Sequence, residues 1–88
     1  MQLEKYLVEF FGTFVFLYVI ISTGNPLAIG AILAFCVFLG GKISGGNFNP
    51  AVTIMMAAAK KLPTAEVVPY IIAQVAGGLL ALALYNRM

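Results

Sequence analysis

Residues 42–61 read KISGGNFNPAVTIMMAAAKK, and this stretch sets the architecture of the whole chain. Asn49 is a preferred residue for capping a helix, and Pro50 suits the first helical position after it. A helix from Pro50 to Lys60 would rise about 16 Å, roughly half the hydrocarbon core of a bilayer. The segment is too apolar for an aqueous loop, and it lacks the polar face of a helix that lies flat on a membrane. It therefore predicts a re-entrant half-helix, which enters the membrane halfway and leaves on the same side.

Two glycines, Gly45 and Gly46, precede the predicted half-helix. Glycine allows a non-helical backbone to approach other elements closely. Irregular backbone at membrane depth is tolerated only where protein buries it or where it lines a water-filled cavity. A re-entrant loop at residues 42–61 therefore predicts a pore or a substrate cavity beside it.

Three apolar segments accompany this loop, at about residues 3–22, 27–41 and 64–85. About 20 apolar residues cross a bilayer, and a dense turn signal at residues 23–26 separates the first two segments. We predict an all-α membrane protein. Residues 1–88 form one domain of three transmembrane helices and one re-entrant half-helix.

The composition of the 88 residues favours a multi-pass integral membrane protein. Hydrophobic residues make up 62% of the chain and charged residues 9%, whereas soluble proteins contain about 25% charged residues. This balance excludes a soluble globular enzyme, and five Lys and Arg residues are too few for a nucleic-acid binding surface. One Cys, no His and three acidic residues provide neither a metal-ligand cluster nor a catalytic triad. We therefore expect no enzymatic activity and no cofactor.

Three motifs carry a family resemblance: SGGNFNPAVT at residues 44–53, EFFGT at residues 9–13 and YIIAQ at residues 70–74. In this order and spacing they resemble the first half of the aquaporins and aquaglyceroporins, whose chains contain two such units in tandem. The resemblance covers nearly the whole chain and implies one half of an inverted-repeat channel fold. Val52 follows the Asn-Pro-Ala triplet here, whereas Arg follows it in the second half of family members.

The resemblance also implies roles for individual residues. Asn49, Pro50 and Ala51 form the signature triplet at the pore, where the Asn49 amide donates hydrogen bonds to passing solutes. Glu9 and Gln74 support the loop. We expect Glu9 to accept backbone hydrogen bonds and not to relay protons, because the chain has no His. The loop's own supporting residues are Ser44, Gly45 and Gly46.

The number of membrane crossings determines how a pore could be completed. Three crossings put the termini on opposite sides, so a second unit would enter the membrane inverted. We expect an antiparallel homodimer in which two half-helices meet at the midplane, and four such pores would form an octamer. The opposed helix N-termini each carry roughly +0.5 charge, which repels cations and interrupts proton transfer along a file of water. The predicted function is a passive channel for water and small neutral solutes such as glycerol.

Two alternatives to a homodimeric channel stay open, and the distribution of basic residues bears on the first. These residues are divided four to one between the two sides of the membrane: Lys5, Lys42, Lys60 and Lys61 against Arg87. A protein inserted in both orientations should carry balanced counts. One alternative is therefore a heteromer whose second half is a separate chain inserted the other way. The other is a non-conducting membrane interaction protein.

Selectivity residues are implied by the narrow filter of the family. An ungapped alignment back from the signature loop places the aromatic position of this filter at Ile29, and the Arg position of a second copy at Val52. In a two-fold symmetric pair, these two apolar side chains would ring both mouths. This arrangement predicts a wide constriction that passes glycerol with water. The alternative is that Ile29 packs against lipid.

Small residues predict close helix packing. Ala73, Gly77 and Ala81 recur every four positions and form a face against which another helix can pack. Gly12 and Gly30 suit close crossings on the first and second apolar segments.

Overall fold

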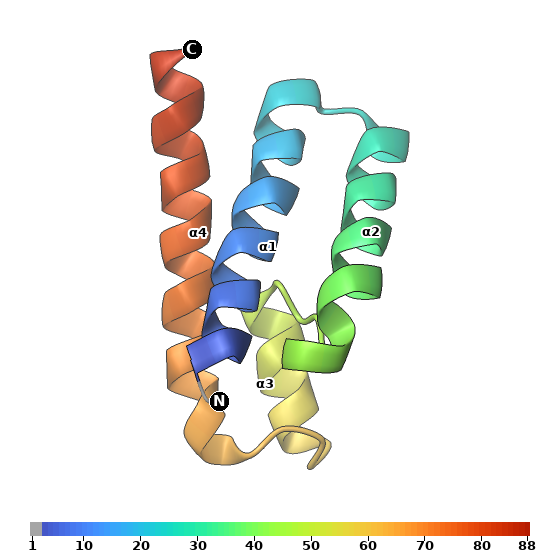
Figure 1. The fold of residues 1–88 in the computed structure, drawn as a ribbon, viewed down its shortest axis with the longest axis vertical. Coiled ribbons are helices and arrows are strands. Elements are labelled where there is room, and N and C mark those ends of the chain that lie inside the picture. Colours follow the sequence, from blue (N-terminus) through green and yellow to red (C-terminus); the bar gives the residue numbers. More distant parts are fainter. Residues whose placement is uncertain (1–2) are drawn as a thin grey trace.

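The computed structural model describes residues 3–88. Its elements are α1 (Leu3–Thr23), α2 (Pro26–Ser44), α3 (Pro50–Ala58), the short 3-10 helix η1 (Thr64–Glu66) and α4 (Val67–Arg87) (Figure 1). Within the described residues, three helices are long and apolar enough to cross a membrane: Leu3–Thr23, Pro26–Ser44 and Thr64–Arg87. The predicted all-α membrane fold, with three membrane-length helices and one short helix, is confirmed.

The central helix of the bundle is α1, which packs against α2 on one side and α4 on the other (Figure 1). The shorter α3 packs against α4 and occupies the lower half of the bundle in this view. The chain rises from the lower end of α2, and α3 then descends to that same end. The start of α1 and the end of α4 lie at opposite ends of the bundle, as three crossings require.

The second helix is longer than we expected from the sequence. It continues to Ser44 instead of ending near residue 41, because the Lys42 side chain is exposed and does not interrupt it. It ends at Gly45, whose left-handed backbone has a φ of 91°. The irregular loop before α3 therefore comprises residues 45–49 and not the whole stretch from residue 42.

The short helix α3 begins at Pro50 and ends at Ala58, two residues before the expected end at Lys60. Asn49 caps its start, because the Asn49 Oδ1 accepts a hydrogen bond from the Ala51 N–H at 2.7 Å. At the other end, Lys60 adopts a left-handed conformation with a φ of 62°, which cannot continue the helix. The nine residues of α3 span about 14 Å.

Helices α1 and α4 approach each other closely at Gly77. A Cβ placed on Gly77 would lie 2.5 Å from the Phe10 carbonyl oxygen. Ala81, one turn further along α4, is buried, and Ala73 is half-buried. At Gly30 of α2, by contrast, a Cβ would meet nothing within 4 Å. Gly30 is therefore not at a helix contact within this chain, unlike our expectation.

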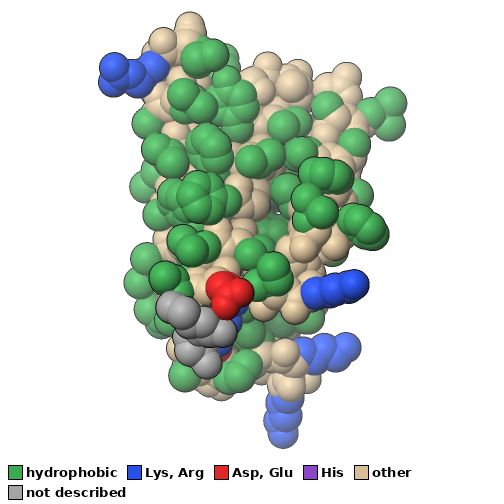
Figure 2. Space-filling model, in the orientation of Figure 1, with side chains coloured by type: hydrophobic (Ala, Val, Ile, Leu, Met, Phe, Trp, Pro, Cys, Tyr) green, Lys and Arg blue, Asp and Glu red, His purple; other side chains and the backbone are tan. Residues whose placement is uncertain are grey.

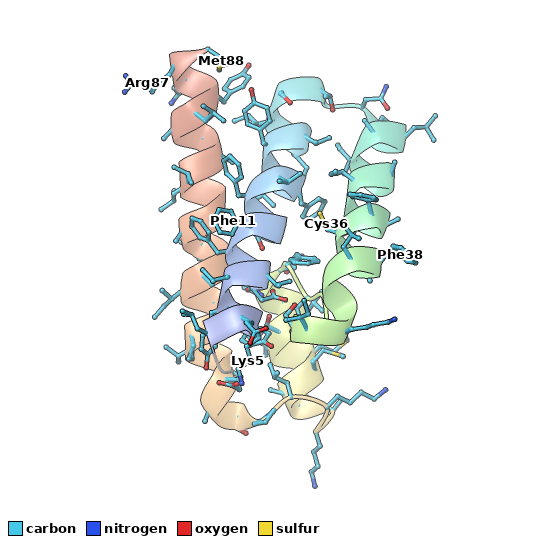
Figure 3. All side chains as sticks on the ribbon, in the orientation of Figure 1. Lys5, Phe11, Cys36, Phe38, Arg87 and Met88 are labelled. Carbon is cyan, nitrogen blue, oxygen red and sulfur yellow. The ribbon has the colours of Figure 1, made fainter. Side chains whose placement is uncertain are left out.

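The outside of the bundle is apolar between charged ends. Figure 2 shows hydrophobic side chains over the middle of one face, with Lys and Arg side chains toward its two ends. Lys5 lies at the lower end and Arg87 at the upper end (Figure 3). Leu27 and Phe38 are 83% and 79% exposed. Exposed apolar side chains of this kind are typical of an integral membrane protein.

Candidate functional site

A cluster of buried polar side chains lies inside this apolar bundle. We call these six residues the polar cluster: Glu9 and Thr13 of α1, Ser44 of α2, Asn47 of the loop, Thr53 of α3 and Gln74 of α4. Each is at most 7% exposed. Buried polar groups in native proteins are nearly always hydrogen bonded, so the bonds within the cluster define the site.

Glu9 is at the centre of the polar cluster and is fully buried. Its Oε2 accepts hydrogen bonds from the Ser44 hydroxyl at 2.7 Å and the Asn47 N–H at 3.1 Å. Its Oε1 accepts from the Phe48 N–H and from the Gln74 amide nitrogen, both at 2.8 Å. A carboxylate can only accept hydrogen bonds, and these donors replace the water that it loses on burial. Glu9 thereby connects α1 to α2, the loop and α4.

The amide of Gln74 and the hydroxyl of Thr53 join α4 to α3. The Gln74 amide nitrogen donates to the Thr53 Oγ1 at 2.7 Å, and the Asn47 amide donates to the same oxygen at 3.3 Å. The Tyr70 hydroxyl donates to the Ser44 carbonyl at 2.7 Å and so connects α4 with the end of α2. The start of α3 is therefore held by side chains from the loop and from α4.

The loop contains two left-handed glycines next to α2. Gly45 and Gly46 have φ angles of 91° and 66°, which side-chain-bearing residues rarely adopt. A Cβ on Gly46 would lie 3.4 Å from the Cα atoms of both Val37 and Gly41. The irregular backbone therefore runs directly against α2, where a larger residue would not fit.

Phe48 is a buried apolar residue of the site that the sequence analysis did not single out. It is 1% exposed, and its ring lies against Gly12 of α1, where a Cβ would overlap it. A Cβ on Gly40 of α2 would lie 3.4 Å from the same ring. We expected Gly12 to serve a crossing of two helices. It also leaves room for an aromatic ring from the loop.

Sequence reasoning also did not assign Thr13 or Thr53 to the site. Thr13 follows Glu9 by four residues on α1, and Thr53 follows Asn49 by four residues at the start of α3. Residues four apart lie on the same helix face. This spacing from a predicted site residue is the signal that could have identified both threonines.

An open cavity of about 430 Å³ lies beside the N-terminal end of α3, between α1 and α4. We call it the α1–α4 cavity. Three segments line it: Thr13, Phe16 and Leu17 of α1; Phe48, Asn49 and Pro50 at the start of α3; and Gln74, Val75, Gly78, Leu79 and Leu82 of α4. Two buried atoms of the lining residues, Thr13 Oγ1 and Gln74 Oε1, have no hydrogen-bond partner among residues 3–88. These two atoms are buried within the chain, and the lining of the cavity is mainly apolar.

The signature triplet lies on the open side of the structure. Asn49, Pro50 and Ala51 are exposed, and the first two line the α1–α4 cavity. Because the Asn49 Oδ1 caps α3, the amide nitrogen is the part of this side chain left to bind a ligand.

The two predicted selectivity residues do not meet within one chain. Ile29 and Val52 are both half-buried. Ile29 belongs to the first turns of α2 at the upper end of the bundle, whereas Val52 belongs to α3 in the lower half (Figure 1). Within residues 3–88 these two side chains therefore do not form a shared constriction.

Other titratable groups lie outside the polar cluster. Residues 3–88 contain no group of three or more His, Cys, Asp or Glu side chains that could hold a metal ion. Cys36 of α2 faces α1, with its Sγ 3.8 Å from the Gly12 carbonyl oxygen (Figure 3). At the lower end, Lys5 pairs with Glu66, which also accepts a hydrogen bond from the Tyr6 hydroxyl. This contact joins the start of α1 to the segment before α4.

The sequence profile of the family described as Major intrinsic protein matches residues 1–88. The Glycerol uptake facilitator protein-like 6 of Lactiplantibacillus plantarum is 40% identical over 90 aligned residues, which cover 92% of this chain and 42% of the relative. The Aquaporin Z of Photorhabdus laumondii is 39% identical over 97 residues, covering 93% and 42%. The Aquaporin Z of Rhodopseudomonas palustris is 37% identical over 99 residues, covering 96% and 41%. The chain therefore spans about two fifths of the length of these relatives.

Proposed function

The chain belongs to the major intrinsic protein family, and on this premise we propose that it forms one half of a passive channel for water and small neutral solutes. Relatives named Aquaporin Z and Glycerol uptake facilitator protein-like 6 support this class of solute. The family is one of membrane channels and not of enzymes.

The observation that carries the proposal is the position of Asn49. This residue begins a nine-residue helix partway along the bundle and lies at the wall of an open cavity. Its capping bond leaves the amide nitrogen to donate to the oxygen of a water or a hydroxyl group. The helix end beside it carries roughly +0.5 charge, which disfavours cations and protons at the same place. A neutral oxygen is therefore the ligand that fits.

The polar cluster supports a fixed position for this helix end. Glu9 and Gln74 are loop-supporting residues, because their side chains bond to the loop and to α3. Donors surround both oxygens of Glu9, which leaves no lone pair directed at a proton-carrying solute. Ser44, Gly45 and Gly46 support the same loop through their hydrogen bonds and left-handed backbone.

An inverted counterpart would complete the pore. The half-helix α3 occupies the lower half of the bundle, and the α1–α4 cavity lies open beside its N-terminal end. A second copy related by a two-fold axis in the membrane plane would bring its own α3 into the opposite half. We assign this role to an antiparallel homodimer, and four such dimers would form an octamer.

The same pairing brings the selectivity residues together. Ile29 and Val52 lie in opposite halves of one copy, so inversion of the second copy would place Ile29 of one beside Val52 of the other. Two apolar side chains at each mouth form a constriction without the Arg of a narrow filter. Such a pore passes glycerol as well as water.

A heteromeric half-channel is the second candidate, and the charge distribution favours it. The described basic residues are Lys5, Lys42, Lys60 and Lys61 near the lower end, against Arg87 at the upper end. Loops rich in Lys and Arg stay on the cytoplasmic side, so this asymmetry favours a single orientation. A separate inverted chain would then supply the second half-helix.

Osmotic swelling of proteoliposomes tests conduction. Asn49→Asp keeps the capping oxygen and removes the amide donor, so we expect water and glycerol flux to fall about tenfold, the equivalent of one lost hydrogen bond of ~1.4 kcal/mol. The matched control is Asn25→Asp, because Asn25 also precedes a proline and caps α2 by accepting from the Ala28 N–H. Equal flux in the two variants contradicts the role of the Asn49 amide in the pore, and wild-type flux no higher than in empty liposomes contradicts conduction by this chain alone. A non-conducting interaction protein would give that second result.

Labelling of a cysteine at either terminus from one side of the membrane tests the assembly. The variants carry Cys36→Ala, so that the introduced cysteine alone reacts. Two equal populations support the antiparallel homodimer, whereas a single population supports the heteromer. In the swelling assay, water flux with complete exclusion of glycerol would contradict the proposed wide constriction.

A further inference from the structure

Another open cavity, of about 400 Å³, lies between α1 and α2, and the channel proposed above does not use it. We call it the α1–α2 groove. Its lining residues run from Val8 to Val15 on α1 and from Ile32 to Ile43 on α2. The part on α2 rises about 16 Å, which is about half the hydrocarbon core of a bilayer. The groove therefore has the length of one leaflet of a membrane.

The α1–α2 groove is open to the surroundings of the bundle. Gly12 and Gly40, which also line it, have no side chains to fill it, so the groove reaches inward to the ring of Phe48. Five apolar side chains of the lining are more than one third exposed: Phe11 and Val15 of α1, and Phe35, Leu39 and Ile43 of α2. A ligand from outside the chain can therefore contact the groove along its length.

The chemistry of the groove limits what can occupy it. Water is a poor occupant, because an ordered water needs polar partners and the groove is lined by apolar side chains and glycine. An empty groove would deprive its lining of dispersion contacts. At this depth of a bilayer the surrounding material is the acyl chains of lipids, and one chain lying along the groove would supply those contacts. Because all lipid tails are similarly apolar, the tail does not determine which lipid binds.

A positive charge at the lower end of the groove can make that selection. Lys42 is exposed, directly precedes Ile43 and follows Leu39 by three residues on the same helix. Figure 2 shows Lys and Arg side chains gathered at the lower end of the bundle, on the side of α2. A lysine near a membrane surface keeps its aliphatic stem on apolar surface and extends its ammonium group to the headgroups. The apolar groove and its charged end thus match the tail and the headgroup of an anionic lipid.

We propose that the α1–α2 groove binds an anionic phospholipid. One acyl chain lies along the groove between α1 and α2, and the headgroup phosphate pairs with the Lys42 ammonium group. This site is separate from the α1–α4 cavity and from the signature triplet. The inference therefore concerns how the chain binds its membrane and does not depend on conduction.

Competing lipids of equal chain length test the charge at the end of the groove. The full chain in detergent micelles is titrated with dioleoyl phosphatidylglycerol or dioleoyl phosphatidylcholine, and native mass spectrometry measures the bound lipid. We expect the anionic lipid to bind about fivefold more tightly, the contribution of one lysine near a membrane surface. Lys42→Gln should abolish this preference. The matched control is Lys61→Gln, because Lys61 is also exposed at the lower end but does not line the groove.

The outcomes of the charge test separate a discrete site from a general surface effect. Retention of the preference in Lys42→Gln would overturn the proposal, as would the absence of any preference in the wild type. Equal losses in the two lysine variants would also overturn it, since they would mean that the lysines attract anionic lipid without a site.

A substitution that fills the groove tests the position of the acyl chain. Val15→Phe should weaken binding of phosphatidylglycerol about threefold, through the loss of several dispersion contacts. Val68→Phe is the control, because Val68 is 64% exposed on α4 and lines neither the groove nor the α1–α4 cavity. Wild-type lipid binding in Val15→Phe would overturn the proposal. If the mass spectra of that variant also showed a lower oligomeric state, a second copy of the chain and not a lipid would cover the groove.

A chemical modification gives the same test without a change of sequence. Cys36 lines the groove and lies between α1 and α2 (Figure 3), so alkylation of the folded wild type with N-ethylmaleimide should obstruct it. We expect a similar, about threefold loss of phosphatidylglycerol binding. This measurement decides the matter if Val15→Phe lacks the helical circular dichroism of the wild type. Unchanged binding after complete alkylation would overturn the proposal.

Discussion

The space between α1 and α4 is filled at one end of the bundle and open at the other, although the same two helices form both ends. At the filled end, the end of α2, the loop and α4 supply donors to both oxygens of Glu9. Toward the open end, Thr13 Oγ1 and Gln74 Oε1 are as deeply buried but have no hydrogen-bond partner among residues 3–88. Hydrogen-bond pairing, more than burial, therefore distinguishes the two ends.

The largest effect should come from removing the acceptor at the filled end. Glu9→Gln keeps the size of the side chain but sets an NH2 group against N–H and O–H donors, so at least one buried donor loses its partner. We expect the free energy of unfolding to fall by about 3 kcal/mol. Unfolding of the reconstituted chain measures this loss, and hydrogen exchange at the Asn47 and Phe48 amides should report the freed loop.

The matched control for this change is Glu66→Gln, which neutralises a carboxylate that pairs with Lys5 near the end of the bundle. Its loss should be below about 1 kcal/mol, because a partly solvated ion pair contributes little. Similar losses in the two variants would mean that the bonds to Glu9 do not hold the filled end together.

A smaller loss of stability should follow from a substitution that pushes α1 and α4 apart. Gly77→Ala puts a methyl group 2.5 Å from the Phe10 carbonyl oxygen, and the backbone must move to accept it. We expect a loss of about 1–3 kcal/mol in the free energy of unfolding. Gly30→Ala is the control, because its methyl group meets nothing within 4 Å and should cause no loss. An equal response at the two glycines would argue against a close α1–α4 contact.

The smallest effect should come from one bond at the edge of the filled end. Tyr70→Phe removes the hydroxyl that donates to the Ser44 carbonyl, at a cost of about 1 kcal/mol. Tyr85→Phe, at an exposed position near the C-terminus, should change the free energy of unfolding by less than about 0.5 kcal/mol. Thermal unfolding of both variants in the same lipid compares their stabilities directly. A larger loss in Tyr85→Phe would refute a stabilising hydrogen bond between the Tyr70 hydroxyl and the Ser44 carbonyl.

Much of the fold could be predicted because its signals are local. The apolar segments indicated three membrane-length helices, and Asn49 with Pro50 indicated where a short helix begins. The ends of α2 and α3 were predicted less well, because Gly45 and Lys60 end these helices through left-handed backbone conformations. Lysine does not favour a left-handed conformation, so the sequence did not predict that α3 ends before Lys60.

The contacts of the site were harder to predict because they join distant parts of the chain. Gly12 was expected at a helix crossing, but the sequence did not indicate that it also lies against the ring of Phe48, 36 positions further along the chain. The family resemblance drew attention to Glu9 and Gln74. It did not show that Thr13 lies near them without a partner.

The sequence by itself determined the number of membrane crossings and the presence of a helix too short to cross. Both depend on the number of apolar residues between one turn and the next, and this number can be counted directly along the sequence. The tertiary structure alone decided which polar atoms are paired, since residues 9, 53 and 74 meet only after the helices pack. A hydrogen bond requires its two atoms to lie within about 3 Å of each other in a defined direction, and positions along a sequence do not specify that geometry.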